Sequence, residues 1–218
     1  MATVRPLHQW RYLHLLVAIL VMLVAYPYAG GGGALGVAAV LIPVASVSAV
    51  ASWRRPRMIP LALGIVTLAG IVQRAAGIAV LPLPAVALCA LLLFAYTTIY
   101  VLARVLRSEQ VTGDTLCGAI AVYLMIGLTW SLVYVLQEWI APGSFRVTTA
   151  GMSAVDGKDL LYFSYVTLAT LGYGDVVAVR DGPRSLAVLE AISGTIYIAI
   201  LVARLMGLYL LTQTGKPR

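Results

Sequence analysis

Residues 159–175 read DLLYFSYVTLATLGYGD. Positions 159–169 are mostly apolar or aromatic and suit a helix of about three turns. That is too short to cross a bilayer, because a spanning helix needs about 20 residues. The helix leads into a loop with glycines at 172 and 174, and irregular backbone at membrane depth is tolerated only where it is buried in protein or lines a polar path. The segment therefore predicts a re-entrant helix and loop.

The loop after this helix has the chemistry to hold a dehydrated cation. One strand from each of four chains could surround an ion with backbone carbonyls and the Thr170 hydroxyl. Gly172 and Gly174 allow dihedral angles that point successive carbonyls at one axis, while Leu171 and Tyr173 would face outward and brace the strand. We expect K+ sites at Thr170, Leu171, Gly172 and Tyr173 and no other metal or cofactor. Residues 170–174 are called the filter segment below.

Residues 170–175, Thr-Leu-Gly-Tyr-Gly-Asp, resemble the filter signature of the pore-loop potassium channel superfamily at six consecutive positions. The resemblance is strong over residues 116–211, whereas the first four spans resemble the bacterial six-helix type only in number and arrangement. It implies a homotetrameric channel that conducts K+ passively, with no enzymatic activity. The implied partners are three identical subunits, membrane lipid and K+. No auxiliary subunit is specified by the sequence.

The composition places most of the chain in lipid. It is 61% hydrophobic and only 11% charged, and a soluble domain with this balance would expose large apolar patches. We expect an all-α integral membrane protein with the re-entrant helix between its fifth and sixth transmembrane helices. The apolar runs predict spans at 12–28, 34–53, 58–77, 84–106, 116–139 and 184–211.

Charged residues predict the orientation and divide the chain. Basic residues concentrate in cytoplasmic flanks, so alternating spans place both termini in the cytoplasm of a multi-pass protein in a plasma or bacterial inner membrane. The net charge of +7 then reflects topology, and we expect no nucleic-acid partner. Because no acidic residue precedes Glu109, we expect a four-helix domain at 1–107, a linker at 108–114, a pore domain at 115–212 and a short cytoplasmic tail at 213–218.

The resemblance also implies residues that support the filter segment. Tyr162 and Phe163 stand where two aromatic residues of the re-entrant helix pack around the filter tyrosine. Val166 stands where some relatives bury a glutamate, which argues against a carboxyl pair with Asp175. Asp156 or Asp159 can cap the start of the helix, where carboxylates are favoured. The expected support set is Tyr162, Phe163, Val166, Thr167 and Asp175.

The last span is long enough, at about 40 Å for 28 residues of helix, to cross the membrane and project beyond it. Its spacing places Thr195, Ile198, Val202 and Met206 on one face. By resemblance, this face lines the inner pore and closes it by dewetting. Gly194 is either a bending point or a small residue that permits close packing.

Two ionisable residues, Glu190 and Arg204, also fall in or near the last span. Ionisable groups within a membrane are functional candidates, but we expect support roles here. Glu190 is expected to hydrogen-bond behind the re-entrant helix, and Arg204 is expected to reach the cytoplasmic surface.

The first four spans lack the charges of a voltage sensor, so we expect a voltage-independent channel. A sensor moves several arginines through the field, at about 2.3 kcal/mol per charge for 100 mV. The fourth span has only Arg104 and Arg107, both at its cytoplasmic end, and Arg74 is isolated in the third. These helices would brace the pore or bind a lipid.

Three alternatives are open at this point. A nonselective cation channel shares the architecture, although Tyr173 argues against it. A regulatory subunit that does not conduct by itself would not need an intact filter. An intramembrane aspartyl protease shares the Gly172-Tyr173-Gly174-Asp175 pattern, but its chemistry needs two carboxylates that share a proton. The other aspartates of this chain fall in predicted loops or at helix ends.

Overall fold

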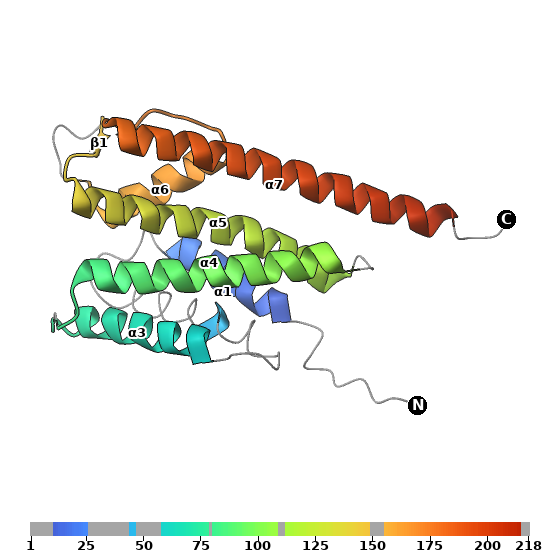
Figure 1. The fold of residues 1–218 in the computed structure, drawn as a ribbon, viewed down its shortest axis with the longest axis horizontal. Helices are drawn as coiled ribbons and strands as arrows, with labels where there is room; N and C mark the ends of the chain where they lie inside the picture. Colours follow the sequence, from blue (N-terminus) through green and yellow to red (C-terminus); the bar gives the residue numbers. More distant parts are fainter. Residues whose placement is uncertain are drawn as a thin grey trace.

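The structure is a computed structural model that describes residues 11–25, 44–46, 58–78, 80–108, 112–148 and 155–214. The predicted second span lies outside the described residues except for 44–46. The elements are α1 (Arg11–Ala25), α3 (Met58–Ala75), α4 (Leu83–Arg107), α5 (Gly113–Ile140), β1 (Phe145–Val147), α6 (Gly157–Leu168), β2 (Val176–Ala178) and α7 (Asp181–Thr214) (Figure 1). The described part of the chain is therefore helical apart from one two-stranded ribbon.

Helix α5 is the centre of the described bundle. It packs against α1 and α4 and also against α6 and α7, while α3 packs on α4 (Figure 1). The main core is apolar and joins α1, α4 and α5, with Ile19, Leu93 and Ala121 fully buried at its centre. The starts of α1 and α5 are held together where the Tyr12 amide donates to Asp114 at 3.1 Å.

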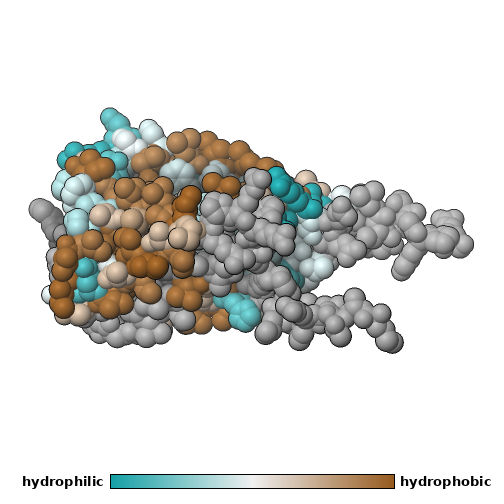
Figure 2. All heavy atoms as spheres, turned by 60° about the horizontal axis from the view of Figure 1, so that its bottom comes forward, coloured by the Kyte–Doolittle hydropathy of each residue, from teal (hydrophilic) through white to brown (hydrophobic). Residues whose placement is uncertain are grey.

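Three helices among the described residues are long and apolar enough to cross a membrane: α4, α5, and α7 from Asp181 to Gly207. The expected fourth, fifth and sixth spans match these helices. Helices α1 and α3 are shorter apolar helices, at Tyr12–Ala25 and Met58–Arg74 in their apolar parts. Apolar residues also cover most of the described part of the face in Figure 2. The chain is a membrane protein built from helices.

Helix α6 begins at a capping box that uses both of the candidate aspartates. Asp156 accepts from the amides of Lys158 and Asp159 at 2.6 and 3.0 Å, and Asp159 accepts from the Asp156 amide at 3.0 Å. Three backbone amides at the helix start find acceptors in this way. The helix is 12 residues long, which confirms that this segment is too short to span a bilayer.

A short ribbon lies beside the filter segment. Strands β1 and β2 are antiparallel, with Arg146 opposite Val177. The loop into β1 is organised by Glu138, whose carboxylate accepts from the amides of Gly143, Ser144 and Phe145 at 2.7–3.1 Å. The end of α5 is therefore fixed to the ribbon through backbone amides.

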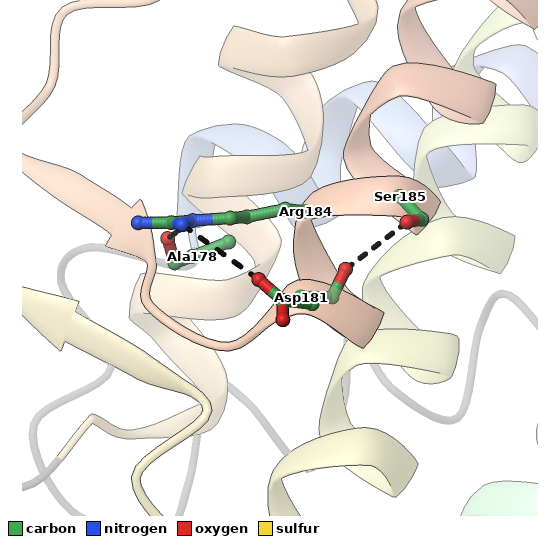
Figure 3. Close-up of polar contacts among 4 residues, drawn as sticks. All are labelled: Ala178, Asp181, Arg184 and Ser185. Atoms are coloured by element: carbon green, nitrogen blue, oxygen red, sulfur yellow. Dashed lines mark hydrogen bonds and ion pairs between the residues drawn. The ribbon is translucent and has the colours of Figure 1, made fainter.

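The turn from β2 into α7 is held by polar contacts at the helix start (Figure 3). Arg184 Nε donates to the Ala178 carbonyl at 3.2 Å, and the Ser185 hydroxyl donates to the Asp181 carbonyl at 3.1 Å. The Arg184 guanidinium also lies 3.8 Å from the Asp181 carboxylate. Both side chains of this ion pair are exposed, so the pair contributes little, and the backbone contacts define the turn.

Candidate functional site: a re-entrant helix and its filter segment

The filter segment has an alternating backbone. The angle φ is positive at Thr170 (57°), Gly172 (59°) and Gly174 (78°), and no other non-glycine residue in the described part of the chain has a positive φ. A regular strand directs successive residues to opposite sides, whereas left-handed residues at every second position can turn successive carbonyls to one side. The sequence predicted unusual dihedral angles at the two glycines but not at Thr170, where the left-handed region costs about 1–2 kcal/mol.

Hydrogen bonds from the end of α6 position the start of this segment. The Thr170 amide donates to the Thr167 carbonyl and the Leu171 amide donates to the Val166 carbonyl, both at 2.9 Å. Val166 and Thr167 therefore support the segment through their backbone carbonyls. At its other end, the Thr148 hydroxyl donates to the Gly174 carbonyl at 2.9 Å. Thr148 could not be predicted from the sequence, because its contact depends on the ribbon.

Tyr162 contacts the residue that follows the filter segment. Its hydroxyl donates to Asp175 Oδ2 at 2.7 Å, and Asp175 Oδ1 accepts from the Val176 amide at 3.0 Å. The Tyr162 hydroxyl bond is the main cause that lowers the pKa of Asp175, and the same bond raises the pKa of Tyr162 to about 12. The contact links the second turn of α6 to the C-terminal end of the filter segment.

We expect Tyr162→Phe to move the pKa of Asp175 back up toward its ordinary value of about 3.9. A group with a depressed folded-state pKa contributes its stabilisation fully above its unfolded pKa and loses it as the pH falls through the folded value. The parent contact is therefore present at neutral pH and lost on acidification. Carboxyl 13C shifts of labelled aspartate measure this titration. Tyr173→Phe is the matched control, and a larger rise in the control than in Tyr162→Phe would contradict the assignment.

Phe163 lies in an aromatic cluster behind α6. Its ring centroid is 5.2 Å from Tyr134 and 5.3 Å from Phe145, both edge-to-face, a geometry that aromatic pairs favour. Tyr173 of the same chain is not among its ring contacts in the described residues. Within one chain, Phe163 therefore packs α6 against α5 and β1. The side chains of Leu171 and Tyr173 are exposed.

Helix α6 is tied to α5 along its length by side-chain hydroxyls. The Tyr165 hydroxyl donates to the Leu124 carbonyl at 2.8 Å, and the Tyr123 hydroxyl donates to the Leu168 carbonyl at 3.4 Å. The Cβ of an alanine at Gly127 would lie 2.6 Å from the Tyr165 ring. These residues were not expected from the sequence, because a tyrosine in an apolar helix has no distinctive spacing.

The two ionisable residues of α7 are held by hydrogen bonds. Glu190 is fully buried and lies within 2.5 Å of the hydroxyls of both Tyr134 and Ser164, so the expected hydrogen bonding behind the re-entrant helix is present. Arg204 donates to the Ser108 carbonyl at 2.6 Å. Its partner lies directly after α4, in the segment 108–114 that the sequence analysis expects to be a linker, and snorkelling of Arg204 to the cytoplasmic surface stays a prediction.

The rest of α7 is a continuous helix through Gly194. An alanine Cβ there would lie 2.6 Å from the Leu168 carbonyl oxygen, so close packing against α6 accounts for this glycine. The four expected lining residues are all exposed in the single chain. Other apolar residues of α7, such as Val188 and Ile196, are also exposed, so exposure alone does not select the lining face. The expected lining set is Thr195, Ile198, Val202 and Met206.

Among the described residues, Asp175 has no second carboxylate beside it of the kind that an aspartyl protease needs. The hydrogen-bond partners of its carboxylate in the described residues are the Tyr162 hydroxyl and the Val176 amide. No group of three or more His, Cys, Asp or Glu residues that could hold a metal ion occurs in the described ranges. The geometry of Asp175 is that of a structural carboxylate at the end of a loop.

Known proteins are similar to this chain over the region that contains the filter segment. A family model described as "Ion channel" (Ion_trans_2) matches residues 118–210, from α5 through the filter segment into α7. The protein named LctB from Bacillus caldotenax is 31% identical over 120 residues, covering 53% of this chain and 87% of its own, and LctB from Geobacillus stearothermophilus is 32% identical with the same coverage. No solved structure matches. The chain belongs to this ion channel family, within the pore-loop potassium channel superfamily.

Proposed function

We propose that four copies of the chain form a potassium-selective channel. The observation that carries this proposal is the alternation of left-handed residues at Thr170, Gly172 and Gly174, directly after a re-entrant helix. Four such strands around one axis would supply rings of carbonyl oxygens that replace the hydration shell of K+. Helix α6 ends at Leu168 beside this segment, and the C-terminal end of a helix carries partial negative charge, which favours a cation.

The single chain exposes apolar surface that a tetramer would cover. Leu171 and Tyr173 are 55% and 67% exposed, and Val188, Ile192, Ile196 and Ile200 form an exposed apolar row on α7. Side chains from neighbouring copies would brace the filter segment and pack on this row. Closed cyclic symmetry is the usual arrangement for a homo-oligomer that encloses a central path.

The remaining parts of the proposal concern the inner pore and the orientation. Thr195, Ile198, Val202 and Met206 line the inner cavity, and Val202 and Met206 form an apolar constriction that can close by dewetting. Gly194 can serve as a hinge in addition to its packing role. Both termini are cytoplasmic, and opening is independent of voltage because Arg104 and Arg107 both lie in the last turn of α4.

We expect native mass spectrometry of the detergent-solubilised protein to give four copies, because one chain has one filter segment and four strands are needed to surround the ion. Liposomes that contain the purified tetramer should release K+ down its gradient. A conducting monomer or dimer would contradict the proposed assembly. A tetramer that does not pass K+ by itself would support the regulatory-subunit alternative.

A further inference from the structure

Glu190 is an acidic side chain buried in the middle of the molecule. Its exposed fraction is 0%, and it lies in α7 between α5 and α6. In the described residues, the polar contacts of its carboxylate are the hydroxyl groups of Tyr134 and Ser164, and no cationic side chain acts on it. An ionised carboxylate without a counter-charge is very costly to bury, whereas a protonated one is not.

The oxygen atoms around Glu190 indicate how many hydrogens they share. The Ser164 hydroxyl oxygen lies 2.5 Å from Glu190 Oε1 and 2.7 Å from the Gly127 carbonyl oxygen. A serine hydroxyl has one hydrogen to donate. If Glu190 were ionised, one of these two contacts would bring two acceptors together without a proton between them. A protonated Glu190 removes the conflict, because Oε1–H donates to Ser164 and Ser164 donates to Gly127.

The second carboxyl oxygen fits the same assignment. The Tyr134 hydroxyl lies 2.5 Å from Glu190 Oε2 and donates to it. The neutral acid therefore donates once and accepts once. Glu190, which belongs to α7, bonds to Tyr134 of α5 and to Ser164 of α6, and Ser164 in turn bonds to the Gly127 carbonyl of α5. The other ionisable side chains of the described residues that face it are Tyr123 on α5 and Tyr165 on α6.

We propose that Glu190 is a protonated carboxylic acid and acts as a positioning residue that locks the re-entrant helix between α5 and α7. It does not touch the permeating ion. Loss of its proton to solvent at high pH would remove the donor to Ser164, leave an unpaired buried charge and loosen α6 from its two supports. The filter segment begins two residues after α6 ends, so its geometry would be disturbed.

The protonation state can be measured without reference to conduction. The infrared C=O stretch of a neutral carboxylic acid is separate from the carboxylate bands, and exposed acids are ionised at neutral pH. We expect one such band in the reconstituted protein, absent in Glu190→Gln. Tyr134→Phe keeps the acid but removes the hydrogen bond to its carbonyl oxygen, so the variant should shift the band to higher wavenumber. This shift identifies the band as that of Glu190 even if Glu190→Gln fails to fold. No acid band at neutral pH, or a band that neither variant changes, would overturn the assignment.

The positioning role rests on the proposed channel function and needs a second readout. Glutamine can donate from its amide to Ser164 and accept from Tyr134, so Glu190→Gln imitates the neutral acid and cannot ionise. Between about pH 6 and about pH 10 we expect K+ flux to fall several-fold in the parent and to stay level in Glu190→Gln. All tyrosines and lysines remain in the variant, so a difference between the two pH profiles is due to the ionisation of Glu190. Identical pH profiles, or loss of flux in Glu190→Gln at every pH, would refute the positioning role. If neither protein conducts, the channel proposal fails while the infrared result still decides the protonation state.

Discussion

Gly172→Ala and Gly174→Ala are expected to abolish selective K+ flux while leaving the tetramer assembled. The φ values of 59° and 78° lie in a region that L side chains rarely adopt, which costs about 1–2 kcal/mol per residue. A Cβ at either position would meet no described atom of the chain within 4 Å. The expected damage is therefore to the backbone conformation that sets the carbonyl positions, and not to packing.

A matched control separates selectivity from general strain. Gly77 also has a positive φ, 74°, and lies after α3, away from the filter segment; none of the residues that the structure describes has an atom within 4 Å of the added Cβ. Gly77→Ala should have a similar stability cost without changing the K+/Na+ flux ratio. We expect Gly172→Ala to lower that ratio by at least about tenfold, equivalent to about 1.4 kcal/mol. A parental ratio in Gly172→Ala would show that these carbonyls do not select the ion.

Gly194→Ala is expected to destabilise the fold, although alanine is the better helix former by about 1 kcal/mol. The new Cβ would lie 2.6 Å from the Leu168 carbonyl oxygen and 2.9 Å from Leu168 Cδ1. A backbone atom at the end of α6 cannot move aside without moving the filter segment. Overpacking typically costs about 1–3 kcal/mol, so we expect a lower melting temperature and reduced K+ flux.

Gly207→Ala is the control on the same helix, because no atom of the described part of the chain lies within 4 Å of the added Cβ. It should leave the melting temperature unchanged or raise it. The comparison also separates the two roles considered for Gly194. If Gly194→Ala raises the melting temperature and alters only channel opening, bending is its main role and the packing account is wrong.

The sequence predicted the parts of the fold that local patterns determine. The run at 159–169 and its flanking aspartates predicted α6 and its cap, because the length of a helix, its apolar content and its cap residues can all be read from neighbouring positions in the sequence. The expected long apolar runs correspond to α4, α5 and α7 in the same way. The boundaries differ by only a few residues, as in the last span, which was predicted at 184–211 and is observed at Asp181–Thr214.

The contacts that support the filter segment could not be predicted in full because they join residues distant in sequence. Glu190 was expected to bond behind α6, but its partner Tyr134 is 56 residues away and has no distinctive spacing. Thr148 contacts the filter segment only because the ribbon brings it there. Phe163 was expected beside the filter tyrosine from resemblance, while in this chain its ring contacts are Tyr134 and Phe145.

The most direct test of potassium selectivity is the reversal potential of the purified protein in a planar bilayer, with K+ on one side and an equal concentration of Na+ on the other. A filter built from the carbonyls of residues 170–174 predicts a reversal potential far from zero, with the K+ side negative. A reversal potential near zero would mean that Na+ passes as readily as K+, and it would contradict the central claim.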